Sequence, residues 1–302
     1  VLFRSEPAAN LSAETAEPAA GPAISAASLV GVTFAGRYKV ERLLGEGGMG
    51  AVYLVHHLGI RKRMALKLLR PELIAMPSAL ARFEREAMAA AHFEHPNVAA
   101  ATDYGRIGEG ASAGRFYLAL EYVEGTELRR VIEASKGPLP PARALFLLRQ
   151  VVSALCRASE LGIVHRDLKP ENVMLVRREG HDDFVKILDF GTVLIAGSQE
   201  MNSPLDKSIP QGSVNYIAPE YLMGLSGTMR SDLFSLGVIV YEMLVGKLPY
   251  KERSPRAGKL SSYAELTYTP GKYFRKDLPV WVDAALQKAL QPDPENRYEA
   301  FS

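Results

Sequence analysis

The chain has 302 residues, 47% hydrophobic and 23% charged, which is the composition of a globular protein long enough for one large domain or two lobes. Its 36 basic and 34 acidic side chains nearly balance, so the net charge gives no argument for binding to nucleic acid or to a membrane surface. The single cysteine, Cys156, excludes an intramolecular disulfide and a thiolate zinc cluster. We expect it to be a buried structural thiol in a reducing compartment.

Residues 1–36 are rich in Ala, Pro, Ser and Glu and have no sustained periodicity, which predicts a disordered linker. A trimmed signal sequence is the alternative for this segment. The sequence begins with Val1 and stops within what reads as a structural element, so we expect a fragment of a longer protein, truncated at its C-terminus.

From Arg37 the sequence predicts a small β-rich region. The short runs YKVERLL, AVYLVHHL and RMALKLL alternate in polarity and are separated by turn-forming residues, as in an antiparallel sheet. The stretch SALARFEREAMAAAHFE has helical spacing, and FYLALEYVEG is typical of a buried strand that ends in a glycine turn. We therefore expect one main helix among these strands.

Beyond Gly125 the pattern becomes mainly helical. Helices are predicted at 140–161, 231–246 and 279–290, with two short strands, NVMLV and FVKILDF, between the first two helices. The apolar run at 233–246 contains Glu242 and is too short to cross a membrane, so it predicts a buried core helix. The fold class expected is α+β, with an N-lobe at 37–121, a hinge at 121–125 and a C-lobe at 126–302.

The first motif with chemical content is LGEGGMGAVYLV, which places glycines at 45, 47 and 50 and Val52 two residues later. Glycines allow the backbone to approach phosphates closely. A dinucleotide-binding fingerprint would need a helix after the glycines, whereas AVYLV predicts a strand. A hairpin that covers a nucleotide is favoured, and a glycine turn without a ligand stays open.

The second motif, MALKLL, places Lys67 on a strand, on the same face as Ala65. A lysine beneath a glycine hairpin can bind phosphate oxygens if a carboxylate holds it in place. Glu86, in the predicted helix, is the candidate for that carboxylate, and Glu84 is its rival.

The third and fourth motifs are IVHRDLKPEN at 163–172 and VKILDFGT, in which Asp189 follows an apolar strand and precedes a glycine turn. Asp189 and Asn172 offer oxygen ligands that suit Mg²⁺. With Lys67 they would form an electrostatic clamp around phosphates, and Asp167 would remain free to accept a proton.

Together the motifs resemble the eukaryotic-type protein kinase family, and within it the bacterial serine/threonine branch. HRDLKPEN matches the family signature, and the resemblance continues through APE at 218–220, SDLFSLG at 231–237 and PENRY at 294–298. It implies a two-lobed protein kinase fold, with a small β-rich N-lobe and a larger helical C-lobe. It also implies transfer of the γ-phosphate of ATP to serine or threonine hydroxyls of proteins, with Mg²⁺ as the metal.

The resemblance assigns roles to individual residues. Lys67, braced by Glu86, would hold the α- and β-phosphates, Asp167 would orient the substrate hydroxyl, and Lys169 would steady the γ-phosphate. Asn172 and Asp189 would hold magnesium, Ala65 and Met174 would enclose adenine, and Leu120 would precede the hinge. The implied nucleotide-binding residues are Gly45, Glu46, Gly47, Gly48, Gly50, Val52, Ala65, Lys67, Leu120, Glu121, Val123 and Met174.

Other matched residues imply architecture. His165 resembles a spine residue stacked near Phe190, Asp232 would anchor the backbone of the catalytic loop, and Glu220 and Arg297 resemble a buried ion pair. The sequence RREGHDD is expected to enlarge the turn between the two short strands.

The segment 192–217 would be the activation loop, in which Thr192 and Val193 depart from the family pattern. Ser213 would contact Asp167 and Lys169. Arg166 implies regulation by phosphorylation of this loop, because an arginine there can pair with a phosphate. The candidate acceptors are Ser198, Ser203 and Ser208. Autophosphorylation between two copies in a transient homodimer is a further expectation.

Two other functions fit part of the sequence. A pseudokinase that acts as a scaffold normally lacks one of Lys67, Asp167 or Asp189, and all three are present. A small-molecule kinase of related fold would lack the APE and SDLFSLG elements. The favoured expectation is a cytoplasmic bacterial signalling protein that acts on protein substrates, has no membrane segment here and binds no nucleic acid; a membrane tether outside this sequence stays open.

Overall fold

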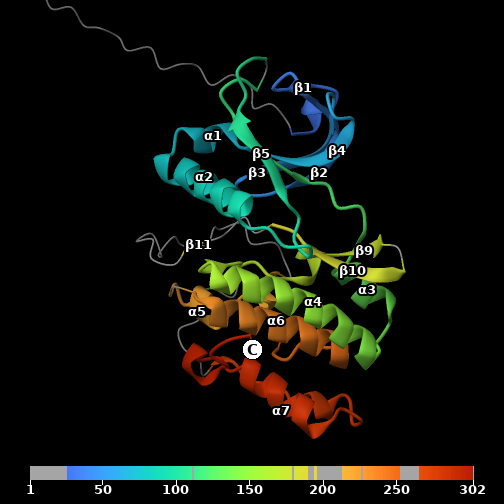
Figure 1. Cartoon of the computed structure of the whole chain (residues 1–302). Helices are drawn as coiled ribbons and strands as arrows, with labels where there is room; N and C mark the ends of the chain where they lie inside the picture. The colour runs from blue at the N-terminus through green and yellow to red at the C-terminus, as the bar shows by residue number, and fades with distance from the viewer. Residues whose placement is uncertain are drawn as a thin grey trace, which may run out of the picture.

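The computed structural model describes residues 26–110, 112–178, 180–189, 194–195, 213–225, 227–251 and 265–301. These residues form two lobes, a β-rich lobe at the top of Figure 1 and a larger helical lobe below it. This is the predicted two-lobed α+β fold.

Six strands form the sheet of the N-lobe, in the order β1-β2-β3-β4-β6-β5, and all neighbours are antiparallel. In β4, alternate residues Met64, Leu66 and Leu68 are buried in the core of the lobe, so Lys67 faces the other side of the sheet, as its alternation predicted. The strands are β1 (Thr33–Phe34), β2 (Tyr38–Glu46), β3 (Gly50–His57), β4 (Lys62–Leu69), β5 (Ala101–Arg106) and β6 (Phe116–Glu121).

A short helix, α1 (Pro71–Ile74), leads into the main helix of the N-lobe, α2 (Pro77–His92). Helix α2 lies against the sheet because Phe83 and Ala87 on its inner face pack with Leu69 and Leu118 of the strands. Figure 1 shows α2 beside the sheet. This packing fixes which side chains of α2 point toward β4.

The structure corrects the predicted linker at 1–36. Ala26–Leu29 forms a 3₁₀ turn and Thr33–Phe34 pairs with β2. Leu29 is 2% exposed and Phe34 is 1% exposed, and both belong to the N-lobe core. The average composition of the segment concealed these apolar residues, whose burial makes residues 29–36 part of the folded lobe. Residues 1–25 lie outside the described part of the chain.

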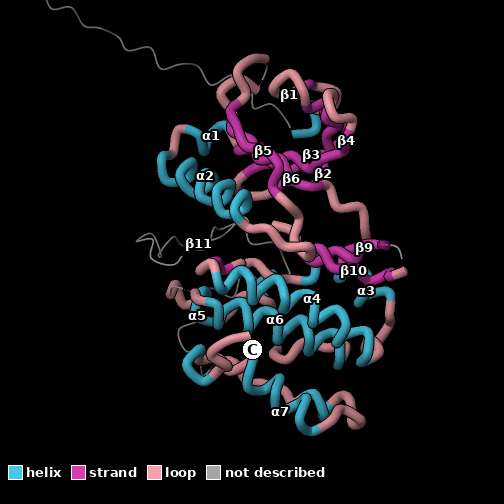
Figure 2. Tube along the Cα trace, in the orientation of Figure 1, coloured by secondary structure: helices cyan, strands magenta, loops and turns pink. Residues whose placement is uncertain are grey.

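The three predicted helices of the C-lobe, α4, α6 and α7, begin and end within two residues of the predicted positions, whereas the short helices α3 and α5 were not predicted. Figure 2 shows the helices of this lobe below the strands. Helix α6 is buried along almost its whole length, as its apolar run predicted. Thr228 caps its first turn by accepting from Arg230 N, and Gly246 ends it with a φ of 72°, which glycine adopts without strain. The helices are α3 (Leu128–Ala134), α4 (Pro141–Glu160), α5 (Pro219–Leu222), α6 (Met229–Val245) and α7 (Val280–Ala289).

Short strands line the upper edge of the C-lobe in two small sheets, β10-β9-β7 and β11-β8. The sequence RREGHDD was expected to enlarge the turn between β9 and β10, but Arg178 pairs with His181, so these residues mainly lengthen the hairpin. The strands are β7 (Thr126–Glu127), β8 (Ile163–Val164), β9 (Val173–Arg178), β10 (His181–Ile187) and β11 (Leu194–Ile195).

Besides the segment 122–125, the chain after α2 also joins the lobes. Val98 pairs in parallel with Ile187 of β10, and Asn97 Nδ2 donates to Val185 O at 2.8 Å. Buried Lys186 donates to Val98 O at 3.0 Å and to Glu121 Oε2 at 2.8 Å. The back of the interlobe cleft is therefore closed by polar contacts between the lobes.

Two remaining expectations concern the exposure of Cys156 and the presence of a membrane-spanning helix. Cys156 is half-buried, less enclosed than the predicted buried thiol, because it lies on a flank of α4. Within the described ranges, none of the helices combines the length and the apolar character needed to cross a membrane.

Candidate active site

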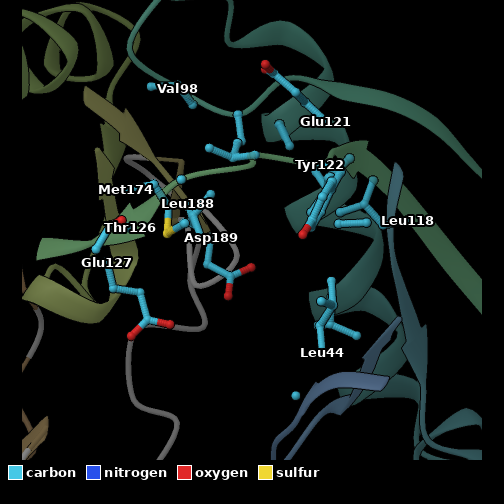
Figure 3. A pocket seen from close by; sticks show the side chains of 18 of the residues that line it. Leu44, Val98, Leu118, Glu121, Tyr122, Thr126, Glu127, Met174, Leu188 and Asp189 are labelled. Carbon is cyan, nitrogen blue, oxygen red and sulfur yellow. The ribbon is translucent and has the colours of Figure 1, made fainter. Parts of the chain in front are cut away.

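A cavity of about 500 Å³ lies between the lobes. Figure 3 shows Leu44 and Leu118 of the N-lobe strands on one side, Met174 and Glu127 of the C-lobe on the other, and the Asp189 carboxylate directed into the space between. The predicted nucleotide-binding residues that line the cavity are Gly45, Val52, Ala65, Leu120, Glu121, Val123 and Met174.

The structure adds lining residues that the sequence reading missed. Leu118 alternates with Leu120 on β6, and Leu188 immediately precedes Asp189, so strand periodicity and neighbourhood could have indicated both. Val98 enters the cavity wall from the loop after α2, and no local sequence signal marks it. Leu44, Tyr122 and Thr126 also line the cavity.

The remaining glycine-loop residues, Glu46, Gly47, Gly48 and Gly50, do not line this cavity. Gly47 N donates to Gly50 O at 2.8 Å and closes the turn between β2 and β3. A Cβ atom on Gly50 would lie 2.1 Å from Leu68 O, a severe clash with the neighbouring strand. Glycine at position 50 is thus required by strand packing, a constraint that the phosphate interpretation did not include.

Lys67 of β4 pairs with Glu86 of α2 through Nζ and Oε1. The side chains are only 13% and 3% exposed. The rival carboxylate, Glu84, is exposed and accepts from Tyr104 OH at 3.4 Å. Glu86 lies beside Ala87 on the face of α2 that packs against the sheet, and for this reason it, and not Glu84, meets the lysine.

The electrostatic surroundings of Lys67 bring three motifs together. Burial lowers the pKa of Lys67, but the carboxylates of Glu86, Asp189 and Asp167 outweigh that effect and raise it overall. The ammonium is therefore charged at neutral pH. Burial raises the pKa of Glu86 to about 7, against the opposing charge of Lys67.

The loop after β8 presents Asp167, Lys169 and Asn172 as one hydrogen-bonded group. Lys169 Nζ donates to Asp167 Oδ2 at 2.6 Å. Asn172 Nδ2 donates to Asp167 O at 2.7 Å and to Asp167 Oδ2 at 3.1 Å. A 3₁₀ turn, Pro170–Asn172, brings Asn172 back toward Asp167. The Asp167 carboxylate is held in place from two sides and stays partly exposed.

The backbone of this loop is anchored from α6. Asp232 Oδ2 accepts from His165 N at 2.6 Å, and Asp232 Oδ1 accepts from Arg166 N at 2.8 Å. The anchoring predicted for Asp232 is therefore present. Buried His165 contacts Leu188 O at 3.2 Å through Nε2. Its expected partner, Phe190, lies outside the described residues.

Asp189 follows β10 with a φ of 49°, a left-handed backbone conformation that aspartate tolerates better than most residues. Leu188 N donates to Asn172 O at 2.8 Å, which ties the residue before Asp189 to the loop that carries Asn172. The side-chain oxygens of Asp189 and Asn172 are the donors suited to a hard divalent cation.

The predicted pair of Glu220 and Arg297 is also present, at 2.8 Å and almost fully buried. The activation-loop predictions at Thr192, Val193, Ser198, Ser203 and Ser208 fall outside the described residues, as does the side chain of Ser213. Arg166 lies over the ring of Tyr221 at 5.6 Å.

Known proteins match this chain over most of its length. The family model described as the protein kinase domain matches residues 38–302. The serine/threonine-protein kinase pkn3 of Myxococcus xanthus is 40% identical over 226 residues, which cover 74% of this chain and 40% of pkn3. The serine/threonine-protein kinase PrkC of Bacillus subtilis (strain 168) is 34% identical over 274 residues, 90% of this chain and 40% of PrkC.

Among solved structures, the PknI kinase domain of Mycobacterium tuberculosis has a TM-score of 0.66 and 30% sequence identity, with 90% of this chain and 94% of that domain covered. The chain spans about 40% of the length of the curated relatives named above.

Proposed function

This chain belongs to the protein kinase family, in its bacterial serine/threonine branch, and from that premise we propose that it transfers the γ-phosphate of ATP to serine or threonine hydroxyls of proteins. The observation that carries the proposal is the convergence of the Lys67 ammonium with the carboxylates of Asp167 and Asp189. These groups come from three separate motifs. Together they provide a cation for phosphate oxygens, a metal ligand and a proton acceptor.

The cavity supports a nucleotide site. Its apolar walls, with Val52 and Ala65 on one side and Met174 on the other, suit a flat adenine ring. Leu120 closes the back, and the segment at 121–123 offers backbone groups for hydrogen bonds. Glu46, Gly47, Gly48 and Gly50 would act from the hairpin above, where Gly47 has open space around it.

The donor set supports magnesium. Asn172 commits Nδ2 to Asp167, so its oxygen remains available as a ligand beside the Asp189 carboxylate. In the described ranges, no cluster of three or more His, Cys, Asp or Glu side chains could hold a metal on its own. A divalent ion here would need phosphate oxygens as further ligands, as Mg²⁺ commonly has in phosphoryl-transfer sites. When bound, it would offset the negative charge of the phosphates.

The protein's own groups would perform the remaining steps. Lys67, held by Glu86, would bind the α- and β-phosphates, and Lys169 would bind the γ-phosphate. Asp167 would accept the proton of the attacking hydroxyl as the new oxygen–phosphorus bond forms and the bond to the leaving ADP breaks. The contacts from Lys169 and Asn172 would hold Asp167 in position for that transfer.

The substrate class and setting are parts of the same proposal. KPEN after Asp167 favours serine and threonine acceptors, including those of the chain's own activation segment, phosphorylated between two copies in a transient homodimer. Loop phosphorylation would act through Arg166. The proposal places the activity in the cytoplasm of a bacterium, since the relatives named above come from bacteria.

The test is transfer from γ-labelled ATP to a generic basic protein in the presence of Mg²⁺, followed by identification of the phosphorylated amino acid. Asp167→Asn should reduce the rate by about 10²- to 10⁴-fold. Asp182→Asn, a change of the same kind at an exposed carboxylate paired with Arg177, should leave the rate unchanged. A chain that binds ATP but transfers nothing would be a scaffold, and that outcome, or equal activity of Asp167→Asn and wild type, would refute the proposal.

A further inference from the structure

Arg129, in the first turn of α3, is bound by acceptors from three other parts of the C-lobe. Its Nε donates to Glu171 Oε1 at 3.0 Å, and its Nη1 donates to Glu242 Oε1 at 2.8 Å. Its Nη2 donates to Tyr216 OH, and the guanidinium lies 5.4 Å from the centre of the Tyr216 ring. Tyr216 OH in turn donates to Glu242 Oε2 at 2.6 Å. We call Glu171, Glu242 and Tyr216 the acidic recess.

The acidic recess begins in the loop that carries Asp167. Glu171 lies in the turn Pro170–Asn172, between two residues that bond directly to Asp167. Glu171 lies four positions after Asp167, so their Cα atoms are at most about 14 Å apart. Two or three residues of an extended peptide, with one arginine side chain, span that distance. A peptide with its hydroxyl at Asp167 can therefore reach the recess.

The acidic recess has more negative charge than Arg129 neutralises. Two carboxylates face one guanidinium, and Glu171 Oε2 is buried without a hydrogen-bond partner in the described part of the chain. The Glu171 side chain as a whole is 38% exposed, so it can be reached from solvent. Without Arg129, the recess would present two carboxylates in a geometry that already fits a guanidinium.

We propose that Arg129 is a specificity determinant for the transfer reaction proposed above: its guanidinium occupies the acidic recess from within the chain and prevents the recess from binding an arginine of a substrate. This inference rests on the proposed function. It predicts that the enzyme is indifferent to arginine near the acceptor hydroxyl, and that removal of Arg129 creates a preference for it. Specificity here would come from filling a site that a basic substrate could otherwise use.

A purely structural role for Arg129, joining α3 to α6, gives different results. It would change stability, or the rate with every peptide alike. The specificity role changes the ratio of rates between peptides that differ in one charge. That ratio is independent of the amount of active enzyme, so it separates the two roles.

The experiment uses the full chain and a set of peptides with one serine. A single arginine is moved through the three positions before and the three after the serine, and each peptide is paired with one that carries citrulline, the uncharged analogue of similar shape. The measured quantity is the ratio of kcat/KM for arginine over citrulline. Wild type should give ratios within about twofold of one at all positions, and Arg129→Gln should raise the ratio about tenfold at one position.

Two further variants locate the effect. In Arg129→Gln combined with Glu171→Gln, the ratio should return toward one, because Glu171, 38% exposed, is the carboxylate of the recess that a substrate arginine can reach from solvent. Arg143→Gln is the matched control, since Arg143 also makes a forked pair, with Asp183 at 2.8 and 2.7 Å, in another part of the lobe. It should leave every ratio unchanged.

The inference is overturned if folded Arg129→Gln keeps the wild-type ratios, or if wild type already prefers arginine and loses that preference with Glu171→Gln. Should Arg129→Gln fail to fold, Arg129→Gln with Glu242→Gln replaces it. This variant removes the mostly buried carboxylate but keeps the accessible Glu171, so it should still show a raised ratio. If wild type phosphorylates no peptide and no generic protein, the proposed function fails as well. Transfer with unchanged ratios refutes this inference alone.

Discussion

Two buried ion pairs, one in each lobe, differ in how completely their polar atoms are bonded. In the C-lobe, Arg297 donates to both oxygens of Glu220 at 2.8 Å and also to three backbone carbonyls. Ser231 adds a further bond to Glu220 at 2.6 Å. In the N-lobe, Lys67 bonds to one oxygen of Glu86, and Glu86 Oε2 is buried without a hydrogen-bond partner among the described residues.

We interpret the difference as one between a pair that holds the fold and a pair with the proposed role of binding phosphate. A fully bonded buried pair has no capacity left for another group, so its contribution is to packing. The partly bonded pair keeps its lysine close to Asp189 and Asp167, ready for an anion. In the N-lobe pair Glu86 can gain a proton near neutral pH, because burial raises its pKa to about 7.

Breaking the C-lobe pair should have the largest effect on stability. Glu220→Gln leaves the guanidinium of Arg297 buried and without its counter-charge, so the free energy of unfolding should fall by about 3–5 kcal/mol. Urea unfolding at equal m-values measures this loss. Asp183→Asn, which weakens the partly exposed pair with Arg143, is the control and should cost under about 1 kcal/mol. If Glu220→Gln also cost under about 1 kcal/mol, the pair of Glu220 and Arg297 would not be the fold-stabilising pair described above.

Breaking the N-lobe pair should have a smaller and pH-dependent effect. Lys67→Met removes the opposing ammonium, so the pKa of Glu86 should rise further above that of an unfolded glutamate. When the pKa of an acid is higher in the folded protein than in the unfolded chain, the folded protein binds more protons between the two pKa values. Stability is therefore full at pH values below the pKa of the unfolded chain and is lost as the pH rises through the pKa of the folded protein. The variant should therefore be less stable than wild type by about 1–2 kcal/mol at pH 8 and nearly equal to it near pH 5.

Unfolding free energies at these two pH values, measured for wild type and Lys67→Met, give the comparison. Glu220→Gln, measured alongside, should show a deficit that is the same at both pH values because Arg297 stays charged. Parallel deficits for both variants would contradict the assignment of Glu86 as the titrating group.

The smallest effect should come from Ser231→Ala. The hydroxyl of Ser231 donates to Glu220 and accepts from Thr228 N at 2.9 Å in the helix cap, so its loss should cost about 1 kcal/mol. In a double-mutant cycle with Glu220→Gln, the loss of stability in the double variant should be smaller than the sum of the losses in the two single variants. Strict additivity would show that Ser231 does not take part in the network around Arg297.

Local patterns sufficed for much of the fold. The apolar run and the turn signals around α6 predicted a buried core helix, and alternation in β4 predicted the direction of Lys67. Both depend on the period of one element, which the sequence contains in full. Composition failed at the N-terminus because Leu29 and Phe34 are two apolar residues within a polar segment.

Contacts between elements that are distant in the chain could not be predicted from the sequence. Helical spacing allowed Glu84 as well as Glu86, and the packing of α2 on the sheet decided between them. The requirement for glycine at position 50 comes from Leu68 O on a neighbouring strand. The partners of Arg129 are 42, 87 and 113 positions away in the chain, a separation at which no motif joins them.

The two hydrogen bonds that Asp232 accepts fix the backbone conformation of the loop ahead of Asp167. They hold the backbone at Arg166, whose φ of 68° is strained for a residue with a side chain, and they originate in the helix that packs deepest in the C-lobe. The curvature of the segment ahead of Asp167, for which we propose the role of proton acceptor, is thus set by folding and does not require a bound nucleotide or peptide. In the proposed reaction, substrate binding would not need to bend this backbone, and the free energy of binding would remain available for the reaction itself.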